Sequence, residues 1–405
     1  MPKTKEKAPS GLPSRMELSS GRPLFRKDQS ITENPRKQDL CAKNAPNKHT
    51  EDTEIPDKFA PHKAKSFDLA ESYRRLSFLP EYELTAEEQK RGALNFWMRR
   101  AERTESCGQY LEFAHEITDG EVSEKGKLHT AYFCMDRLCP MCAWRRSLKI
   151  FGQVSQILEL ISGDYTFLFL TLTVPNCTGE VLSDTLNRLN KAFYQMTKRK
   201  KWQKAVKGYF RALEITYNKR RDDFHPHFHC ILAVPKDYLQ KKTAHADKSC
   251  YIKHEEWLDM WRKAYKEESI QMVNIKAITH RMKYDEGLTE AENLEKAVAE
   301  ACKYAVKSDD IIHPDIELTD KVVRTFSDAL YHRRLSSFSG CFADAFKKLG
   351  LDDAEADDAD LTHISGKLNP ALAWLICRWE WKYGVYVETG QRIEKADEHK
   401  KGVKK

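Results

Sequence analysis

The chain has 405 residues, of which 40% are hydrophobic and 10% aromatic, and this excludes a protein that is disordered throughout. Its 68 Lys and Arg residues outnumber its 61 Asp and Glu residues, but the net charge of +7 identifies no partner unless it is concentrated in space. No signal-peptide core follows Met1, and no apolar run reaches the length of a membrane span. We therefore expect a cytoplasmic protein without membrane contact.

The first 80 residues differ in composition from the rest. They hold nine of the fifteen prolines and none of the eight tryptophans. Because such a segment buries too little apolar surface to offset the loss of chain entropy, residues 1–80 are predicted to form a disordered, basic-leaning arm. Order is predicted to begin near Thr85, since Glu88 follows it in the pattern of a helix capping box.

Three cysteines follow in the close pattern Cys134-x4-Cys139-x2-Cys142. In a cytoplasmic protein this spacing is typical of a structural zinc site, because a tight turn can present its thiolates to one ion. The alternative is a group of buried free thiols. A zinc site needs a fourth ligand, for which Cys107 is the first candidate and His129 the second. We expect residues 81–160 to form a helical and zinc-knuckle region.

A central strand is predicted at 165–174 and a helix at 182–207, before the segment that carries a histidine pair. These elements are expected to belong to one domain over residues 161–310. A helical region is predicted to follow at 311–390, and a charged tail at 391–405.

The histidine pair lies on one strand of a predicted antiparallel hairpin, formed by residues 208–217 and 225–234. Side chains alternate between the two faces of a strand, so His227 and His229 project from the same face. Two neutral imidazoles placed in this way can bind one divalent ion, which predicts a metal site on the sheet. Glu214 on the neighbouring strand is a candidate neighbour of this pair.

A helix is predicted over residues 289–307, and it contains Glu300 and Tyr304. Four residues are close to one helical turn, so the carboxylate and the phenol would project from the same side. In an arbitrary protein such a pair is more commonly a salt-bridge partner and a packing residue. Further along, Asn369 and Pro370 are a good helix start and predict a C-terminal helix with a buried aromatic stripe.

In this combination and order, the elements resemble the HUH endonucleases, specifically the rolling-circle replication initiators (Rep) of small Gram-positive plasmids. The segments that carry the resemblance are Phe169 to Asn176, Arg211 to Asn218, His225 to Val234, Glu300 to Lys307, Cys134 to Arg146 and Arg334 to Gly340. The resemblance implies an α+β fold with an antiparallel sheet of HUH endonuclease type flanked by helices, preceded by the zinc module and the arm. In it, residues 161–310 would be the HUH endonuclease catalytic core. It also implies that His227 and His229 bind Mn²⁺ or Mg²⁺, with Glu214 as the expected third ligand unless the hairpin register places another acidic group there.

The resemblance further implies a reaction. Tyr304 would attack single-stranded origin DNA, leaving a 5′-phosphotyrosine and a free 3′-hydroxyl primer. Glu300, which stands where some relatives have a second tyrosine, would assist the terminating second cleavage. The expected partners are plasmid origin DNA, a host helicase and a DNA polymerase. The sequence leaves two alternatives open. The first is a zinc-containing, sequence-specific DNA-binding regulator without catalysis, and the second is a metal-dependent hydrolase.

Overall fold

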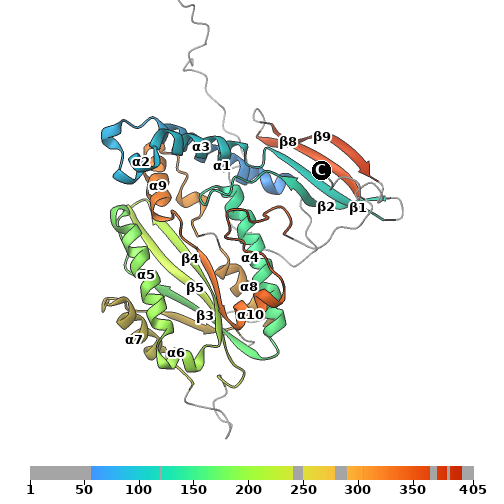
Figure 1. The fold of residues 1–405 in the computed structure, drawn as a ribbon. Coiled ribbons are helices and arrows are strands. Elements are labelled where there is room, and N and C mark those ends of the chain that lie inside the picture. Colours follow the sequence, from blue (N-terminus) through green and yellow to red (C-terminus); the bar gives the residue numbers. More distant parts are fainter. Residues whose placement is uncertain are drawn as a thin grey trace, which may run out of the picture. The chain divides into compact units, whose positions relative to one another are not determined.

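The computed structural model describes residues 56–118, 121–239, 250–278, 290–303, 305–364, 372–380 and 384–394. Within these ranges the strands form two antiparallel sheets, and helices flank them (Figure 1). One sheet has the strand order β6-β3-β5-β4-β7, and the other has the order β2-β1-β8-β9. The predicted α+β class is confirmed. No helix in the described ranges is long and apolar enough to span a membrane.

Three helices precede the first strand: α1 (Pro56–Ser77), α2 (Ala86–Arg91) and α3 (Ala93–Ser106). A 3₁₀ turn at Glu81–Glu83 lies between the first two of them. The predicted capping box is present at the start of α2, where the side chain of Thr85 accepts from the amide of Glu88 and the carboxylate of Glu88 accepts from the amide of Thr85. Gly92 (φ 67°) then separates α2 from α3.

The prediction that residues 1–80 form a disordered arm is wrong for the segment that forms helix α1. Residues 1–55 lie outside the described ranges, but residues 56–77 form a helix with Phe59 and Leu69 fully buried. The helical period was hidden because the buried face of α1 also carries Lys63 and Ser66, which are polar and yet fully buried. Their partners lie far along the chain, so local composition gives no sign of them.

Because α1 is buried, removal of one of its core side chains should destabilise the fold. Phe59 is fully buried against the rings of Phe113 and Trp144, so Phe59→Ala should lower the free energy of unfolding by about 3–5 kcal/mol in urea titration. Phe78 lies just after α1 and is 73% exposed, so Phe78→Ala serves as the matched control and should change stability little. Equal stability of the two variants would show that α1 does not pack as described.

The five-stranded sheet is built around the predicted hairpin. Its strands are β3 (Tyr165–Thr173), β4 (Gly208–Asn218), β5 (Asp223–Pro235), β6 (Asn274–Ala277) and β7 (Ser336–Gly340). In the antiparallel pairing of β4 with β5, Glu214 is directly opposite His227. Strand β5 pairs with β3 on its other side, with Thr171 opposite His229.

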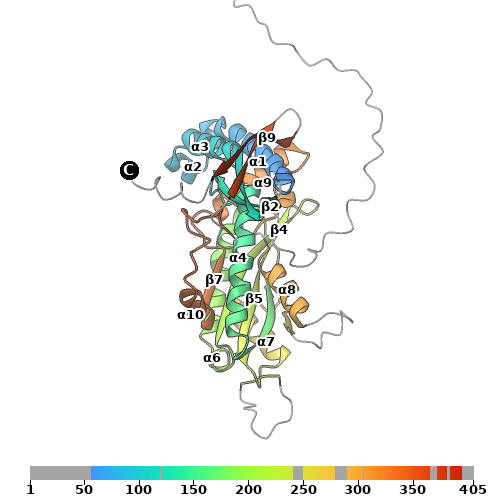
Figure 2. The same cartoon turned by 90° about the vertical axis from the view of Figure 1, so that its right-hand side faces the viewer.

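Helices cover both faces of this sheet (Figures 1 and 2). One face carries α5 (Leu182–Thr197), α6 (Lys200–Ala205) and α7 (His254–Tyr265), with a 3₁₀ turn at Gly179–Val181 before them. The other face carries α4 (Pro140–Ile161), α8 (Glu290–Ala301) and α10 (Cys341–Lys348). Helix α9 (Ile316–Ala329) follows a 3₁₀ turn at Ser308–Asp310.

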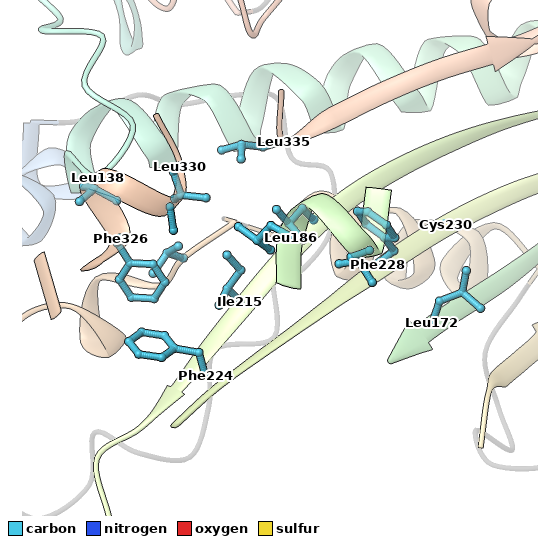
Figure 3. Packing of buried hydrophobic residues seen from close by; sticks show 14 of the residues in the cluster. Leu138, Leu172, Leu186, Ile215, Phe224, Phe228, Cys230, Phe326, Leu330 and Leu335 are labelled. Atoms are coloured by element: carbon cyan, nitrogen blue, oxygen red, sulfur yellow. The ribbon is translucent and has the colours of Figure 1, made fainter. Parts of the chain in front are cut away.

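Alternation along β5 divides its side chains between two hydrophobic clusters. Phe228 and Cys230 pack into the cluster on the side of α5, part of which Figure 3 shows. Ile231 belongs to the other cluster, on the side of α4 and α8. His227 and His229 share the face of Ile231 because they are separated from it by even numbers of residues. The same alternation that builds the core therefore directs both imidazoles to the side of α8.

Residues 311–390 do not form the helical region that was predicted, because strands from this end of the chain belong to the second sheet. Its strands are β1 (Tyr110–Thr118), β2 (Glu121–Ala131), β8 (Leu372–Glu380) and β9 (Val385–Glu394). Asn369 and Pro370, the predicted helix start, lie outside the described residues. The apolar run of β8 fits either a buried helix or a strand, and pairing with β1 decides between them. Because β1 lies more than 250 residues earlier in the sequence, local periodicity could not reveal this partner.

Candidate metal centres and active site

The two histidines predicted to bind a metal meet Glu214 in one buried cluster. The Nε2 atoms of His227 and His229 are 3.2 Å apart. Oε2 of Glu214 lies 2.9 Å from Nε2 of His229 and 3.4 Å from Nε2 of His227. The hairpin register produces this geometry, because it sets Glu214 directly opposite His227.

The other ring nitrogens hold the imidazoles in place. Nδ1 of His227 lies 3.1 Å from the carbonyl oxygen of His225. A carbonyl oxygen only accepts, so Nδ1 of His227 donates in this contact, and Nε2 would be the atom that binds a cation. Nδ1 of His229 lies 3.3 Å from Oγ1 of Thr171 on β3. Such outer contacts are typical of histidines that bind metals. Sequence reasoning missed Thr171, although its position opposite His229 follows from strand pairing.

Glu214 remains ionised in spite of its burial. Burial acts to raise its pKa, but hydrogen bonds with His227, His229 and Lys307 outweigh this effect and hold the pKa well below its usual range. Nζ of Lys307 is 3.0 Å from Oε1 of Glu214. One carboxylate oxygen therefore faces the lysine, and the other faces the two imidazoles.

These three side chains fit a divalent cation. Neighbouring ligands of an octahedral ion with bonds of about 2.1 Å are separated by about 3.0 Å. The three ligand atoms are separated by 2.9, 3.2 and 3.4 Å, as three ligands on one side of such an ion would be. A mixed imidazole and carboxylate set suits Mn²⁺ somewhat better than Mg²⁺, which prefers oxygen.

The helix predicted over 289–307 is shorter than expected. Helix α8 ends at Ala301, so position 304 lies beyond the helix. Helical spacing therefore no longer predicts that Glu300 and Tyr304 project from the same side. Oε1 of Glu300 nevertheless lies 3.9 Å from Nε2 of His229, and its other oxygen forms an ion pair with Lys303. Tyr304 lies outside the described residues.

Two residues that follow position 304 contact strand β4 at or beside Glu214. The amide of Ile215, which is next to Glu214 in β4, donates to the carbonyl oxygen of Ala305 at 2.7 Å. Lys307 is paired with Glu214 itself. On the other side of position 304, Lys303 is paired with Glu300. The chain on both sides of position 304 is thus tied to groups at the cluster.

The four predicted zinc ligands also come together, with Cys107 and not His129 in the fourth place. All four are fully buried. Their sulfur atoms are 3.5 Å apart for Cys107 and Cys142, 3.6 Å for Cys134 and Cys142, and 3.7 Å for Cys139 and Cys107. Tetrahedral zinc with Zn–S bonds of about 2.3 Å requires sulfur atoms about 3.8 Å apart. Disulfide sulfurs would be only about 2.05 Å apart. The four thiols are therefore spaced as the ligands of one zinc ion would be.

Helix α1 supplies polar contacts around the thiols that the sequence did not predict. Nζ of the buried Lys63 donates to the carbonyl oxygens of Glu105 and Cys107, the second at 2.8 Å. Oγ of Ser66 is 3.3 Å from Sγ of Cys139. Burial lowers the pKa of Lys63, an effect that the nearby cysteines oppose. A buried ammonium group beside four sulfurs suits a site whose bound form carries net negative charge.

The fold and the two clusters define an α+β protein with two prospective metal centres, one of four thiols and one of two imidazoles and a carboxylate. Comparison with known families gives a more specific result. The family model Rep_1, described as "Replication protein", matches residues 125–387. The chain belongs to this replication protein family, and the resemblance noted from its motifs is confirmed.

Curated relatives support the same membership. A "Protein rep" of a Bacillus species is 39% identical over 282 residues, which cover 67% of this chain and 87% of the relative. A second, from Bacillus amyloliquefaciens, is 36% identical and covers 73% and 85% of the two chains. A third, from Streptococcus pneumoniae, is 34% identical and covers 65% and 76%. No solved structure matches the chain significantly.

Proposed function

We propose that the protein is a plasmid rolling-circle replication initiator with a fold of HUH endonuclease type. It acts as a site-specific endonuclease and strand transferase on single-stranded origin DNA. Membership in the replication protein family supports a role in plasmid replication. The cluster of Glu214, His227 and His229 supports metal-dependent cleavage of DNA. That cluster is the observation that carries the proposal. A host polymerase would extend the product, after a host helicase has separated the strands.

In this proposal Glu214, His227 and His229 hold Mn²⁺ or Mg²⁺ at the site. The bound cation would supply Lewis-acid stabilisation of the charge that develops on a phosphate oxygen. The carbonyl oxygen of His225 and the hydroxyl of Thr171 hold the two imidazoles with their Nε2 atoms directed to one point. Lys307 holds the second oxygen of Glu214 and fixes the orientation of its carboxylate. The four cysteines hold zinc as a structural ion.

Tyr304 is the proposed nucleophile. Its phenol oxygen forms a bond to phosphorus while the bond from phosphorus to the 3′ oxygen breaks. The phenol proton leaves to solvent, and the 3′ oxygen gains a proton to become the primer hydroxyl. The phosphotyrosine retains the energy of the broken phosphodiester, so a later strand transfer needs no ATP. The pairing of Lys307 with Glu214, and the hydrogen bond from Ile215 beside Glu214 to Ala305, support this assignment.

Glu300 is the proposed base for the terminating cleavage. Its side chain is 42% exposed and reaches within 3.9 Å of His229, so it is open to water at the edge of the cluster. A carboxylate cannot form a second phosphotyrosine, but it can take a proton from an attacking water or hydroxyl group. The protein would thus cut twice in each round with one tyrosine.

A nicking assay tests this function directly. Labelled single strands tiled from the DNA that encodes the protein are incubated with purified protein and Mn²⁺. An initiator yields a cut strand covalently bound to protein, and the cut disappears when Mn²⁺ is omitted. Cleavage without an adduct would instead indicate a hydrolase. Binding without cleavage on any strand would indicate the non-catalytic DNA-binding regulator.

Glu300→Ala should separate the two cleavage steps. We expect the first nick to keep nearly its normal rate, while the covalent adduct accumulates because the second step slows by about 10²-fold or more. Glu292 is exposed on the same helix, so Glu292→Ala is the matched control and should release product normally. Normal release by Glu300→Ala, followed in a gel time course, would remove Glu300 from the mechanism.

A further inference from the structure

A surface groove of about 360 Å³ lies outside both metal clusters. Its walls come from α3, from the turn between Cys134 and Cys139, from the end of α9 and from Asp357. Leu138, Phe326 and Leu330 form its apolar part, and Figure 3 shows these three side chains together at one end of the buried cluster. The ring of Phe326 packs against Phe224 at 5.2 Å, close to the start of the histidine strand. The groove therefore adjoins the hydrophobic cluster on the side of α5.

One wall of the groove carries a buried polar group that forms no hydrogen bond with the described residues. Ser327 on α9 is 5% exposed and lines the groove, and its hydroxyl has no hydrogen-bond partner among the described residues. A buried hydroxyl without a partner destabilises a fold, and such exceptions call for an explanation. A ligand in the groove that accepts or donates a hydrogen bond would supply the missing partner.

The backbone at the walls is also strained. Met135 (φ 60°) and His332 (φ 51°) are two of the four non-glycine residues with positive φ in the described ranges, and both line the groove. Strained backbone of this kind concentrates at binding and catalytic sites, where the surrounding packing maintains it.

Aromatic and cationic groups meet at the mouth of the groove. Tyr331 is 43% exposed. Phe96 packs edge-on against it at 6.4 Å, and the guanidinium of Arg91 lies over its ring, 3.8 Å from the centroid, so one face of the ring is left for a base. Arg100 and Arg137 are already paired with Asp136 and Glu355, respectively. Arg103 is exposed and donates only to the carbonyl oxygen of Cys134 among the described residues, so its positive charge has no carboxylate partner there.

We propose that this groove binds an unpaired nucleobase of the DNA strand. The base would stack on Tyr331, its polar edge would meet the hydroxyl of Ser327, and Arg103 would contact the attached phosphate. Stacking on an aromatic ring beside a cationic group is a general means of holding single-stranded DNA. The inference deepens the proposed function, on which it rests for the identity of the ligand, by adding a base-recognition site away from the cleavage chemistry.

The test measures binding and does not require cleavage. Tyr304→Phe protein without added Mn²⁺ is titrated by fluorescence anisotropy with oligothymidylate and with an abasic strand of the same length. Adding Tyr331→Ala should raise the dissociation constant for oligothymidylate about tenfold and leave that for the abasic strand unchanged. Adding Arg103→Ala should weaken binding of both strands, because phosphate contacts do not depend on the base.

Two matched controls isolate the groove. Tyr82 is 86% exposed elsewhere, and Arg99 is an exposed arginine of α3 that does not line the groove. Tyr82→Ala and Arg99→Ala should each leave both affinities unchanged. Equal losses in the controls, or equal losses of Tyr331→Ala on abasic and base-bearing strands, would overturn the proposal. Binding of thymidine monophosphate with no effect of Tyr331→Ala on the oligonucleotide would assign the groove to a free nucleotide and would also overturn it. These affinities are measured without cleavage, so they can be interpreted even if the nicking assay fails. The proposed function and the base-binding groove can therefore be refuted independently.

Discussion

Tyr304→Phe should abolish both strand cleavage and the covalent DNA adduct. Removal of the nucleophile of a covalent mechanism lowers the rate by about 10⁴-fold or more. The substitution removes one oxygen atom and keeps the ring, so we expect the stability of the fold and the affinity for DNA to stay near those of the unsubstituted protein. Rates measured from labelled strands in denaturing gels check the first expectation, and anisotropy checks the second.

The control for this prediction is Tyr194→Phe on α5. Tyr194 is 61% exposed and lies on the face of the five-stranded sheet opposite the histidines. Its substitution should leave both cleavage and adduct formation intact. If Tyr304→Phe still formed an adduct at a comparable rate, another residue would have to be the nucleophile.

Cys139→Ser should remove the zinc and unfold the module around it. Structural zinc contributes on the order of 10 kcal/mol to folding in small zinc domains, and a serine hydroxyl is a poor replacement for a thiolate. Cys139 also begins α4 and contacts Ser66 of α1, so its loss should loosen both helices. We expect zinc measured by mass spectrometry to fall from one equivalent to near zero, and protease to cut rapidly within residues 56–142.

Cys177→Ser is the matched control for the zinc prediction. Cys177 is a half-buried thiol outside the four-cysteine cluster, and its backbone bridges to Phe224. This variant should retain zinc and resist protease. Zinc that is absent from the unsubstituted protein, or retained in full by Cys139→Ser, would show that the four thiols do not form the proposed centre.

The parts of the site that local pattern could predict are those set by strand alternation and by turn spacing. His227 and His229 share a face because they are two residues apart on a strand, and Glu214 follows from the register of a short hairpin. Cys139 and Cys142 are brought together by a single turn at the start of α4. In each case the geometry depends on a few neighbouring residues.

The parts that could not be predicted depend on partners far away in the sequence. Helix α1 buries Lys63 and Ser66 only because the thiol cluster lies against it. Strand β8 forms because β1 offers an edge for pairing. Lys307 pairs with Glu214, which lies on a strand far earlier in the sequence. Composition and periodicity contain no information on such long-range contacts.

Identification of the residue that becomes linked to DNA tests whether Tyr304 is the nucleophile. Protein is incubated with Mn²⁺ and a cleavable origin strand, the adduct is digested with protease and nuclease, and the modified peptide is sequenced by mass spectrometry. We predict a nucleotide attached through a 5′ phosphate to the phenol oxygen of Tyr304. A modified peptide that carries the nucleotide on another residue, or a cut strand with no modified peptide at all, would contradict the account.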